Sequence, residues 1–247
     1  MTKKNRRPRL KLNARIVPGP NASHSELEAM WRLRLEYLDL RLSEQADWER
    51  FCYYCQKDRT VLALFEDEAG ALQGYFTFTF EPIDQSGRKA LLIHSKYYYV
   101  RTAARGHPKI TSSAWRLLPG LIRRYGLRRI YLVAFAFPTS FVSLSRTFGG
   151  AMTIQDPITP KWEREALSSF ARQQAGQDWD GEAGVIRQQS IPQGEGRPVT
   201  DGIRQLQARY EGFNPDWQEG VSLPIMMKLD APTVWSTMRT NVRRLFR

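Results

Sequence analysis

The stretch KALLIHSKYYYV, residues 89–100, decides how this chain folds. Leucine, isoleucine, valine and tyrosine dominate it, which predicts one long strand. A basic loop over 101–108 follows, and residues 109 to about 125 then predict a helix. The apolar run 129–137 predicts the next strand. Strand, helix and strand in this order predict two parallel strands of one sheet, joined by a right-handed crossover.

Two helices and a β-hairpin precede this stretch. Ser25 and Glu28 have the spacing of a capping box, so the first helix is expected to begin there, and a second is expected after Ser43. The β-rich run 60–65 and the alternating run 72–80 are separated by an acidic turn. These two runs predict an antiparallel hairpin.

The last hundred residues have a less regular pattern. Thr159 and Pro160 predict the start of a helix, with the proline in its first turn. The run 221–229 predicts a strand, in which Pro224 favours an edge position or a bulge. Residues 233–246 predict a basic amphipathic helix.

The composition indicates a folded protein with a basic surface. Apolar residues make up 42% of the chain, and no run approaches the roughly 18 apolar residues of a membrane span. The N-terminus lacks the apolar run of a signal peptide, so we expect a cytoplasmic protein. The net charge of +12 is concentrated in residues 3–15, 101–129 and 239–247. Such a field attracts nucleic acid, anionic lipid, a phosphorylated cofactor or an acidic carrier protein, and charge alone does not choose among them.

Cys52 and Cys55 form a C-x-x-C pattern inside a predicted helix. A redox pair would need a strand before it, and a zinc site would need a second pair of ligands. We therefore predict two half-buried helix cysteines and no metal site.

The order helix, helix, hairpin, strand, basic loop, helix, strand, helix over residues 25–150 resembles the GNAT (N-acetyltransferase-like) superfamily, with 221–229 as a candidate closing strand. The resemblance implies an α+β fold: a mixed, mostly antiparallel sheet flanked by helices, in which one long strand splays from its neighbour. We therefore divide the chain into a basic disordered tail over 1–20, an acyltransferase core over 21–155 and a C-terminal extension over 156–247.

The segment RGHPKI, residues 105–110, stands where this family holds the pyrophosphate of its cofactor with backbone N–H groups at a helix start. Arg105 and Gly106 fit the family's loop, whereas Pro108 and Ile110 replace two small residues. A solvated basic loop is the alternative interpretation. The resemblance implies that the donor contacts Tyr99, Val100, Arg101, Arg105, Gly106 and Lys109.

The resemblance also implies candidate acid and base residues. The family's carboxylate base stands about eleven residues before the leading Arg of the loop, and this position is His94 here, a competent base near pH 7. Glu81, at the end of the hairpin, is the second candidate base. Ser145 stands near the position of the family's Tyr acid, and Tyr131 is its candidate substitute. The alternative for each residue is an ordinary core or surface side chain.

Two functions of different classes follow. The resemblance implies an acyltransferase that moves an acyl group from acyl-CoA or an acyl-carrier-protein thioester to an amine or a similar nucleophile. Plentiful aromatic side chains suit a long acyl chain, and a basic rim suits an acidic acyl carrier protein. The alternative is a non-catalytic module that binds nucleic acid through its basic surface, although the sequence has no nucleic-acid motif. Attachment of residues 233–247 to a membrane surface is a third interpretation.

Overall fold

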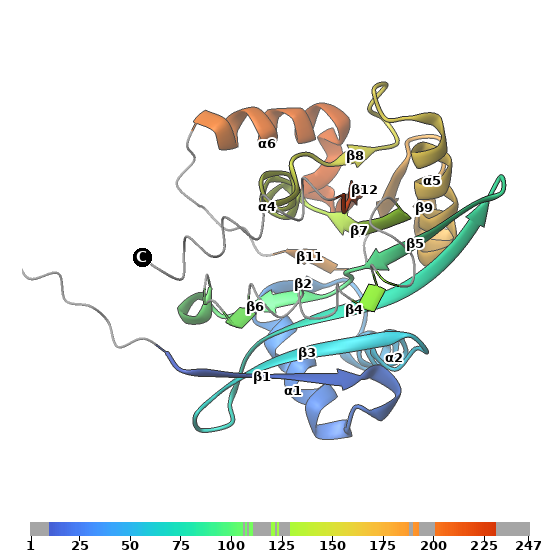
Figure 1. The fold of residues 1–247 in the computed structure, drawn as a ribbon. Helices are drawn as coiled ribbons and strands as arrows, with labels where there is room; N and C mark the ends of the chain where they lie inside the picture. The colour runs from blue at the N-terminus through green and yellow to red at the C-terminus, as the bar shows by residue number, and fades with distance from the viewer. Residues whose placement is uncertain are drawn as a thin grey trace, which may run out of the picture.

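One large sheet organises the chain, as Figure 1 shows. The predicted α+β class is confirmed, because the sheet is mixed, mostly antiparallel and flanked by helices. The computed structural model describes residues 10–105, 107, 109–110, 120–121, 123, 129–187, 190–192 and 201–230. Most of the helix predicted over 109–125, and all of the one over 233–246, lie outside these residues.

The strands are β1 (Leu12–Pro18), β2 (Leu38–Leu40), β3 (Thr60–Asp67), β4 (Leu72–Gln85), β5 (Arg88–His94), β6 (Tyr98–Val100), β7 (Ile130–Ala136), β8 (Met152–Thr153), β9 (Trp179–Asp180), β10 (Val185–Arg187), β11 (Ser190–Pro192) and β12 (Val221–Lys228). The main sheet has the order β1-β3-β4-β5-β7-β12-β10-β9. In addition, β6 pairs with β4, β8 pairs with β12, and β2 pairs with β11 in a separate small sheet. The single parallel pairing among the described strands is that of β5 with β7.

The predicted hairpin is confirmed by the antiparallel pairing of β3 with β4, and the predicted closing strand by that of β12 with β7. One detail of the prediction is wrong. The stretch 89–100 forms two strands, β5 and β6: both pair with β4, but β5 also pairs with β7, whereas β6 does not in the described structure. Pro224 pairs with Phe135 of β7 on one side. On the other side it lies between the residues of β12 that pair with β10 and those that pair with β8, so this side is a local edge, as its missing N–H favours.

The helices cover both faces of the sheet (Figure 1). They are α1 (His24–Leu35), α2 (Glu44–Cys55), α4 (Pro138–Phe148), α5 (Lys161–Ala175) and α6 (Asp201–Phe213). On one face, α1 and α2 pack on Leu64 and Tyr75, and α5 packs on Leu92 and Val133. On the other face lie α4 and α6. This arrangement leaves the boundary between β5 and β7 near the middle of the molecule.

The first helix begins two residues earlier than predicted. Ser23, not Ser25, is its N-cap: the Ser23 hydroxyl accepts from the Glu26 N–H, and the Glu26 carboxylate accepts from the Ser23 N–H at 2.7 Å. Both serines have a glutamate three residues later. Glu26 also accepts from Arg15 of β1 at 2.6 Å, and this tertiary contact favours the earlier capping box.

The basic disordered tail predicted over 1–20 is wrong for its second half. Residues 12–18 form β1, which pairs with β3 along its whole length. Leu12 is 2% exposed, and Arg15 bridges Glu66 at 2.8 Å and Glu26 at 2.6 Å. Burial of Leu12 and hydrogen bonding to the edge of β3 stabilise this segment in spite of its positive charge. The first nine residues lie outside the described part of the chain.

Removal of residues 1–18 is therefore expected to lower the melting temperature by roughly 5–10 °C. The deletion exposes the edge of β3 and the site that Leu12 fills, which is worth about 2 kcal/mol alone. Removal of residues 1–9 alone serves as the control and should change the melting temperature by less than about 2 °C. Differential scanning calorimetry measures both. Equal melting temperatures for the two truncations would show that β1 does not contribute to the stability of the fold.

Candidate functional site

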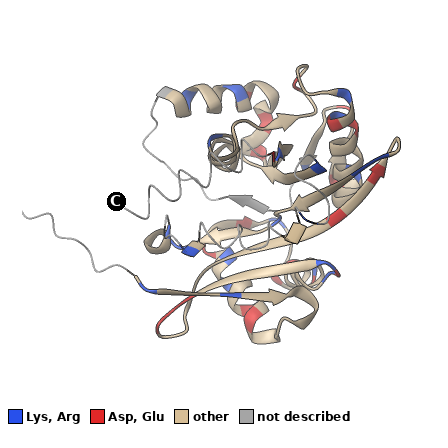
Figure 2. Cartoon of the chain, in the orientation of Figure 1, with Lys and Arg blue, Asp and Glu red and all other residues tan. Residues whose placement is uncertain are grey.

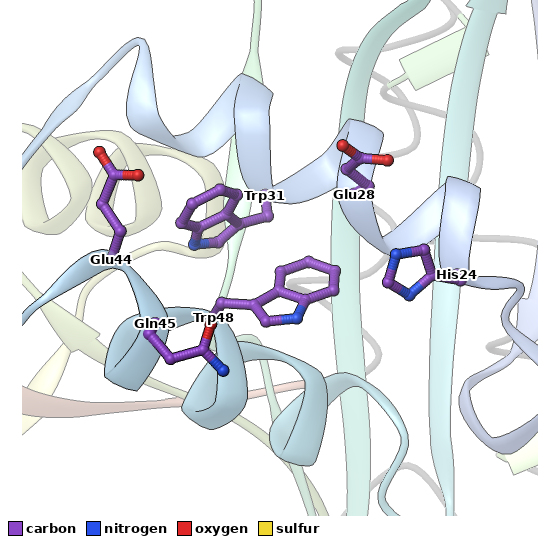
Figure 3. A pocket seen from close by; sticks show the side chains of 6 residues that line it. All are labelled: His24, Glu28, Trp31, Glu44, Gln45 and Trp48. Atoms are coloured by element: carbon purple, nitrogen blue, oxygen red, sulfur yellow. The ribbon is translucent and has the colours of Figure 1, made fainter.

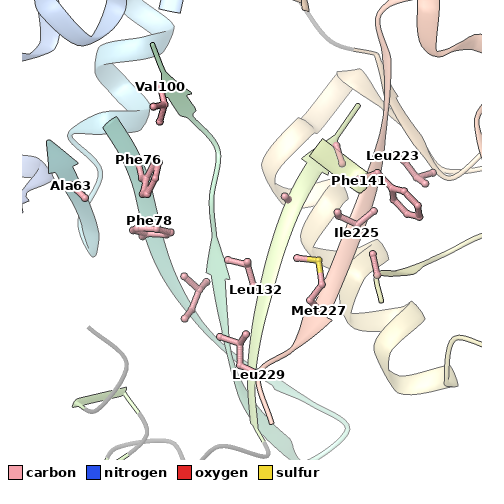
Figure 4. Close-up of a cluster of buried hydrophobic side chains, with 14 of the residues drawn as sticks. Ala63, Phe76, Phe78, Val100, Leu132, Phe141, Leu223, Ile225, Met227 and Leu229 are labelled. Atoms are coloured by element: carbon pink, nitrogen blue, oxygen red, sulfur yellow. The ribbon is translucent and has the colours of Figure 1, made fainter. Parts of the chain in front are cut away.

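Two neighbouring strands separate halfway along their length. The pairing of β5 with β7 ends at His94 and Val133, and the Ser95 N–H makes a last bond to the Val133 carbonyl at 3.1 Å. Beyond this point β6 pairs with β4, while β7 continues beside β12. Figure 4 shows the strands diverging, with Val100 on one arm and Leu223, on β12, beside the other. We call this divergence the splay, and the region of His94 and Ser95 its apex.

A guanidinium lies at the open end of the splay. The Arg101 N–H donates to the Gln73 carbonyl of β4 at 2.9 Å. Because backbone groups alternate sides along a strand, those of Val100 point away from β4. From that side, Arg105 Nε donates to the Val100 carbonyl at 3.1 Å. The structure therefore brings together two of the residues predicted to contact the donor.

Three further residues are predicted to contact the donor: Arg101, Gly106 and Lys109. Arg101 forms an ion pair with Glu36, at the end of α1, so its charge already has a counterion. Lys109 is exposed, and its backbone N–H donates to Nδ1 of His107 at 3.2 Å. Gly106 lies outside the described residues. Among the described cations of the loop, Arg105 is the one whose guanidinium contacts the Val100 carbonyl at the open end of the splay.

Aromatic rings support this end of the splay. Tyr99 stacks with Tyr37 at a centroid distance of 6.1 Å and meets Tyr75 at 5.7 Å. The Arg105 guanidinium lies 5.7 Å from the Tyr37 ring centroid. Burial raises the pKa of Tyr99 to about 12, so its hydroxyl stays protonated at neutral pH. The Tyr99 ring at this end of the splay therefore carries no charge of its own.

His94 lies at the apex and is 2% exposed. Its ring packs against Phe135 at 5.1 Å and against Phe170 of α5 at 5.0 Å, and its Nε2 has no hydrogen-bond partner in the described structure. Burial, followed by the charges of Lys96 and Lys57, lowers the pKa of His94 well below its ordinary value. The imidazole is therefore neutral, and one of its nitrogens has an unused hydrogen-bonding capacity.

The other three predicted catalytic residues lie elsewhere. The Tyr131 hydroxyl donates to Glu163 at 2.9 Å and accepts from Arg88 at 2.8 Å, and burial raises its pKa. Ser145 is buried on α4, against the opposite face of the sheet, with no partner for its Oγ among the described atoms. Glu81 is half-buried on β4, two residues beyond the residue that pairs with His94. Among the four candidates, the structure places His94 at the splay.

Lys96 is a residue at the apex that the sequence pattern does not single out. Its Nζ lies 2.8 Å from the ring centroid of Tyr54 and 5.7 Å from that of Tyr97. Burial, followed by the charges of Arg50 and Lys57, lowers the pKa of Lys96 well below its ordinary value. In the sequence, Lys96 stands out only as a lysine within a run rich in apolar residues. The fold is needed to show that Tyr54 of α2 covers it.

The C-terminal end of α5 encloses the apex together with α2. The Tyr54 hydroxyl donates to the Gln174 carbonyl at 3.1 Å. Arg50 forms an ion pair with Asp178 of the following turn at 3.0 Å. These contacts join segments about 120 residues apart, and they screen the side chains at the apex from solvent.

A separate hollow lies between α1 and α2 (Figure 3). Its volume is about 260 Å³. Two indoles in edge-to-face contact at 5.5 Å and two carboxylates form most of its wall. The lining residues are His24, Glu28, Trp31, Glu44, Gln45 and Trp48. Because all of them belong to the two helices, the hollow is distinct from the splay.

The described surface carries both signs of charge. Figure 2 shows Lys and Arg interspersed with Asp and Glu, and many of these charges form ion pairs. Much of the basic excess noted in the sequence, and most of the surface assigned to nucleic acid or membrane, lies outside the described residues. No described helix is long and apolar enough to span a membrane.

Comparisons with known proteins find similarity only among solved structures; no family model and no curated protein matches. A conserved protein of Enterococcus faecalis, named as a probable N-acyltransferase, has 14% identity and a TM-score of 0.42 over 59% of this chain and 36% of its own. An acyl-CoA N-acyltransferase of Pseudomonas aeruginosa has 19% identity and a TM-score of 0.42 over 58% and 91% of the two chains. A ribosomal-protein-alanine N-acetyltransferase of Brucella melitensis has 15% identity and a TM-score of 0.37 over 55% and 89%. These scores are too low to carry a functional argument.

Proposed function

We propose that this chain is a divergent member of the GNAT superfamily: a cytoplasmic acyltransferase that moves an acyl group from a thioester donor to an amine or a similar nucleophile. The observation that carries the proposal is the splay, with Arg105 at its open end and the neutral His94 at its apex. A linear donor fits this geometry with its anionic end at Arg105 and its thioester towards His94.

The donor is acyl-CoA or an acyl-carrier-protein thioester. Both have a phosphopantetheine arm, whose anionic end suits Arg105 and whose amides suit the exposed backbone edge of a strand. The side chains around the two arms are apolar, including Phe76, Phe78 and Ile225. Each additional methylene buried among them contributes about 0.8 kcal/mol, which supports a preference for acyl chains longer than acetyl.

The reaction is a direct transfer. The nitrogen of the acceptor attacks the thioester carbonyl, a C–N bond forms, the C–S bond breaks, and the thiolate leaves. The ammonium form of the acceptor must first lose a proton, because only a free lone pair can attack. His94 either accepts this proton or holds the water that does. The nitrogen loses a second proton as the C–N bond forms, and one of the two protons ends on the thiolate while the other passes to water. Glu81 is the next candidate, because it lies on the same face of β4 as the residue that pairs with His94.

The first experiment measures binding and turnover separately. The protein is screened by thermal shift against acetyl-CoA, long-chain acyl-CoA and an acyl carrier protein loaded with the same chains, since a ligand of the native state raises the melting temperature. Donors that bind are then incubated with a panel of amines, and thiol release is followed. Thiol release that depends on both donor and amine supports the proposal. Absence of binding and of release for every donor would overturn it.

Arg105→Glu is expected to weaken donor binding by about 10- to 100-fold, because a charge-assisted hydrogen bond contributes roughly 1.5–3 kcal/mol. Rising salt should weaken binding to the wild type, with a smaller effect on the variant. The control is Arg32→Glu, the same charge change on an exposed side chain of α1. Isothermal titration with the bound donor measures all three. Equal loss of affinity in both variants would show that the change in net charge, and not the loss of the Arg105 contact, weakens donor binding.

A further inference from the structure

Lys96 occupies a constrained position between the two pairings that define the splay. The preceding residue, Ser95, bonds to β7, and the Tyr97 carbonyl accepts from the Thr77 N–H of β4 at 2.9 Å. The backbone on either side of Lys96 is therefore fixed. Its half-buried side chain extends over the Tyr54 ring, towards the face that α2 and the end of α5 enclose.

No described carboxylate forms an ion pair with Lys96. The charges that act on it are cations from three elements: Arg34 of α1, Arg50 of α2, and Lys57 just after α2. The acids nearest to these cations are already engaged, Asp47 by Arg34 and Asp178 by Arg50. Cys55 and His94 complete the ionisable surroundings. The face of the Tyr54 ring attracts a protonated amine, but the three surrounding cations and the burial oppose it, so the balance favours the neutral amine, which does not need a counterion.

We propose that Lys96 is the general base of the transfer reaction. This inference rests on the proposed function. The neutral ε-amine takes a proton from the acceptor ammonium, and the acceptor lone pair then attacks the thioester. As the C–S bond breaks, the departing thiolate takes the proton from the Lys96 ammonium. The nitrogen loses its second proton to water as the C–N bond forms, so the proton count balances, and Lys96 returns to its neutral form.

His94 acts beside this base as a positioning residue. Because its pKa lies well below the ordinary value, it holds a proton poorly, and a base of low proton affinity is a weak catalyst. Its unpartnered Nε2 instead suits the water, or the acceptor N–H, that lies between the substrate and Lys96. This assignment gives separate roles to the two residues at the apex.

The test uses Lys96→Met and Lys96→Arg. Methionine keeps the length of the side chain, and arginine keeps the charge but does not release its proton. Both are expected to lower kcat by about 100-fold or more, with donor affinity unchanged within about twofold. For the wild type, kcat should rise with pH along a limb whose midpoint lies well below that of an exposed lysine. Lys89→Met makes the same change at an exposed lysine of β5 and should leave kcat nearly unchanged.

Competitive labelling provides a readout that does not depend on turnover. The protein is pulsed with isotope-coded acetic anhydride across a pH series, and acetylation of each lysine is quantified by mass spectrometry. Lys96 should label with a midpoint well below that of the exposed Lys89, which serves as the internal reference. An ordinary midpoint at Lys96, or full activity of Lys96→Arg, would overturn the inference. If the wild type labels as expected but transfers no acyl group, the proposed function fails instead, and the base role with it.

The pH dependence of the melting temperature provides a further test of the lowered pKa of Lys96, and the direction of the effect can be predicted. The lysine of the unfolded chain binds its proton at the ordinary pKa, while folded Lys96 binds it only at lower pH. Folding is therefore disfavoured as pH falls below the ordinary lysine value. Lys96→Met should melt at a higher temperature than the wild type at pH 7, and the difference should shrink towards pH 10. A lower melting temperature at pH 7 would show that Lys96 is a stabilising structural group.

Discussion

Asp47→Ala is expected to lower the free energy of unfolding by about 3–5 kcal/mol, because it leaves a buried guanidinium without a counterion. Arg34 and Asp47 are 4% and 3% exposed, and they are joined by two hydrogen bonds. The same carboxylate accepts from Trp31 Nε1 at 2.8 Å. A loss of this size lowers the melting temperature by roughly 10 °C in a chain of this length. Urea unfolding at pH 7 measures the free energy.

Two variants show whether burial is the cause. Glu28→Ala removes the partner of Arg32 in an exposed pair one turn apart and should cost less than about 0.5 kcal/mol. The double substitution of Arg34 by Met and Asp47 by Leu should recover most of the stability that Asp47→Ala loses, because no unpaired charge remains. An effect of Asp47→Ala no larger than that of Glu28→Ala would contradict the account of the buried pair.

His94→Ala is expected to reduce kcat by about 100-fold or more, because the proton transfer loses the group that holds the water or the acceptor N–H at the apex. The affinity for the donor should change by less than about twofold, because the anionic end of the donor is bound at Arg105. Single-turnover measurements with saturating donor isolate the chemical step. A larger effect on affinity than on kcat would contradict the placement of His94 at the reacting end of the splay.

A matched control separates chemistry from packing. Thr159 is another buried residue whose side-chain oxygen has no partner among the described atoms, and it lies near the start of α5 rather than at the apex. Thr159→Val removes that hydroxyl at nearly constant volume, so kcat should stay within about twofold of the wild type. His94→Phe keeps a ring between Phe135 and Phe170 and should be as inactive as His94→Ala while folding stably.

The sequence predicts those parts of the fold that local pattern determines. Alternation of apolar side chains identifies β3 and β4, the apolar run identifies β7, and Thr159-Pro160 marks the start of α5. It does not predict β1, because seven positive charges and three prolines in residues 1–20 resemble a tail. The ion pairs of Arg15 with Glu66 and Glu26, which attach this strand, join residues that are distant in the sequence.

The candidate site is predictable to a similar degree. The family resemblance implies the splay and, counted back from Arg105, His94 as a candidate base, and the structure places His94 at the apex. The pattern cannot show that Arg101 pairs with Glu36 or that Tyr131 is bonded by Glu163 and Arg88, because these contacts depend on helix positions. Lys96 escapes prediction for the same reason: α2 supplies the ring that covers it.

The short pairing of β5 with β7 has a mechanical consequence. Residues 91–95 and 130–133 carry the hydrogen bonds that join the two halves of the main sheet in the described structure. A parallel ladder of this length resists bending weakly, so the halves form two plates with a narrow common hinge. Under the proposed function, the separation of the two plates limits the acyl group, and the side chains along this hinge set that separation. Selectivity for chain length can therefore change through substitutions at Leu91 or Ile130 that never contact a substrate.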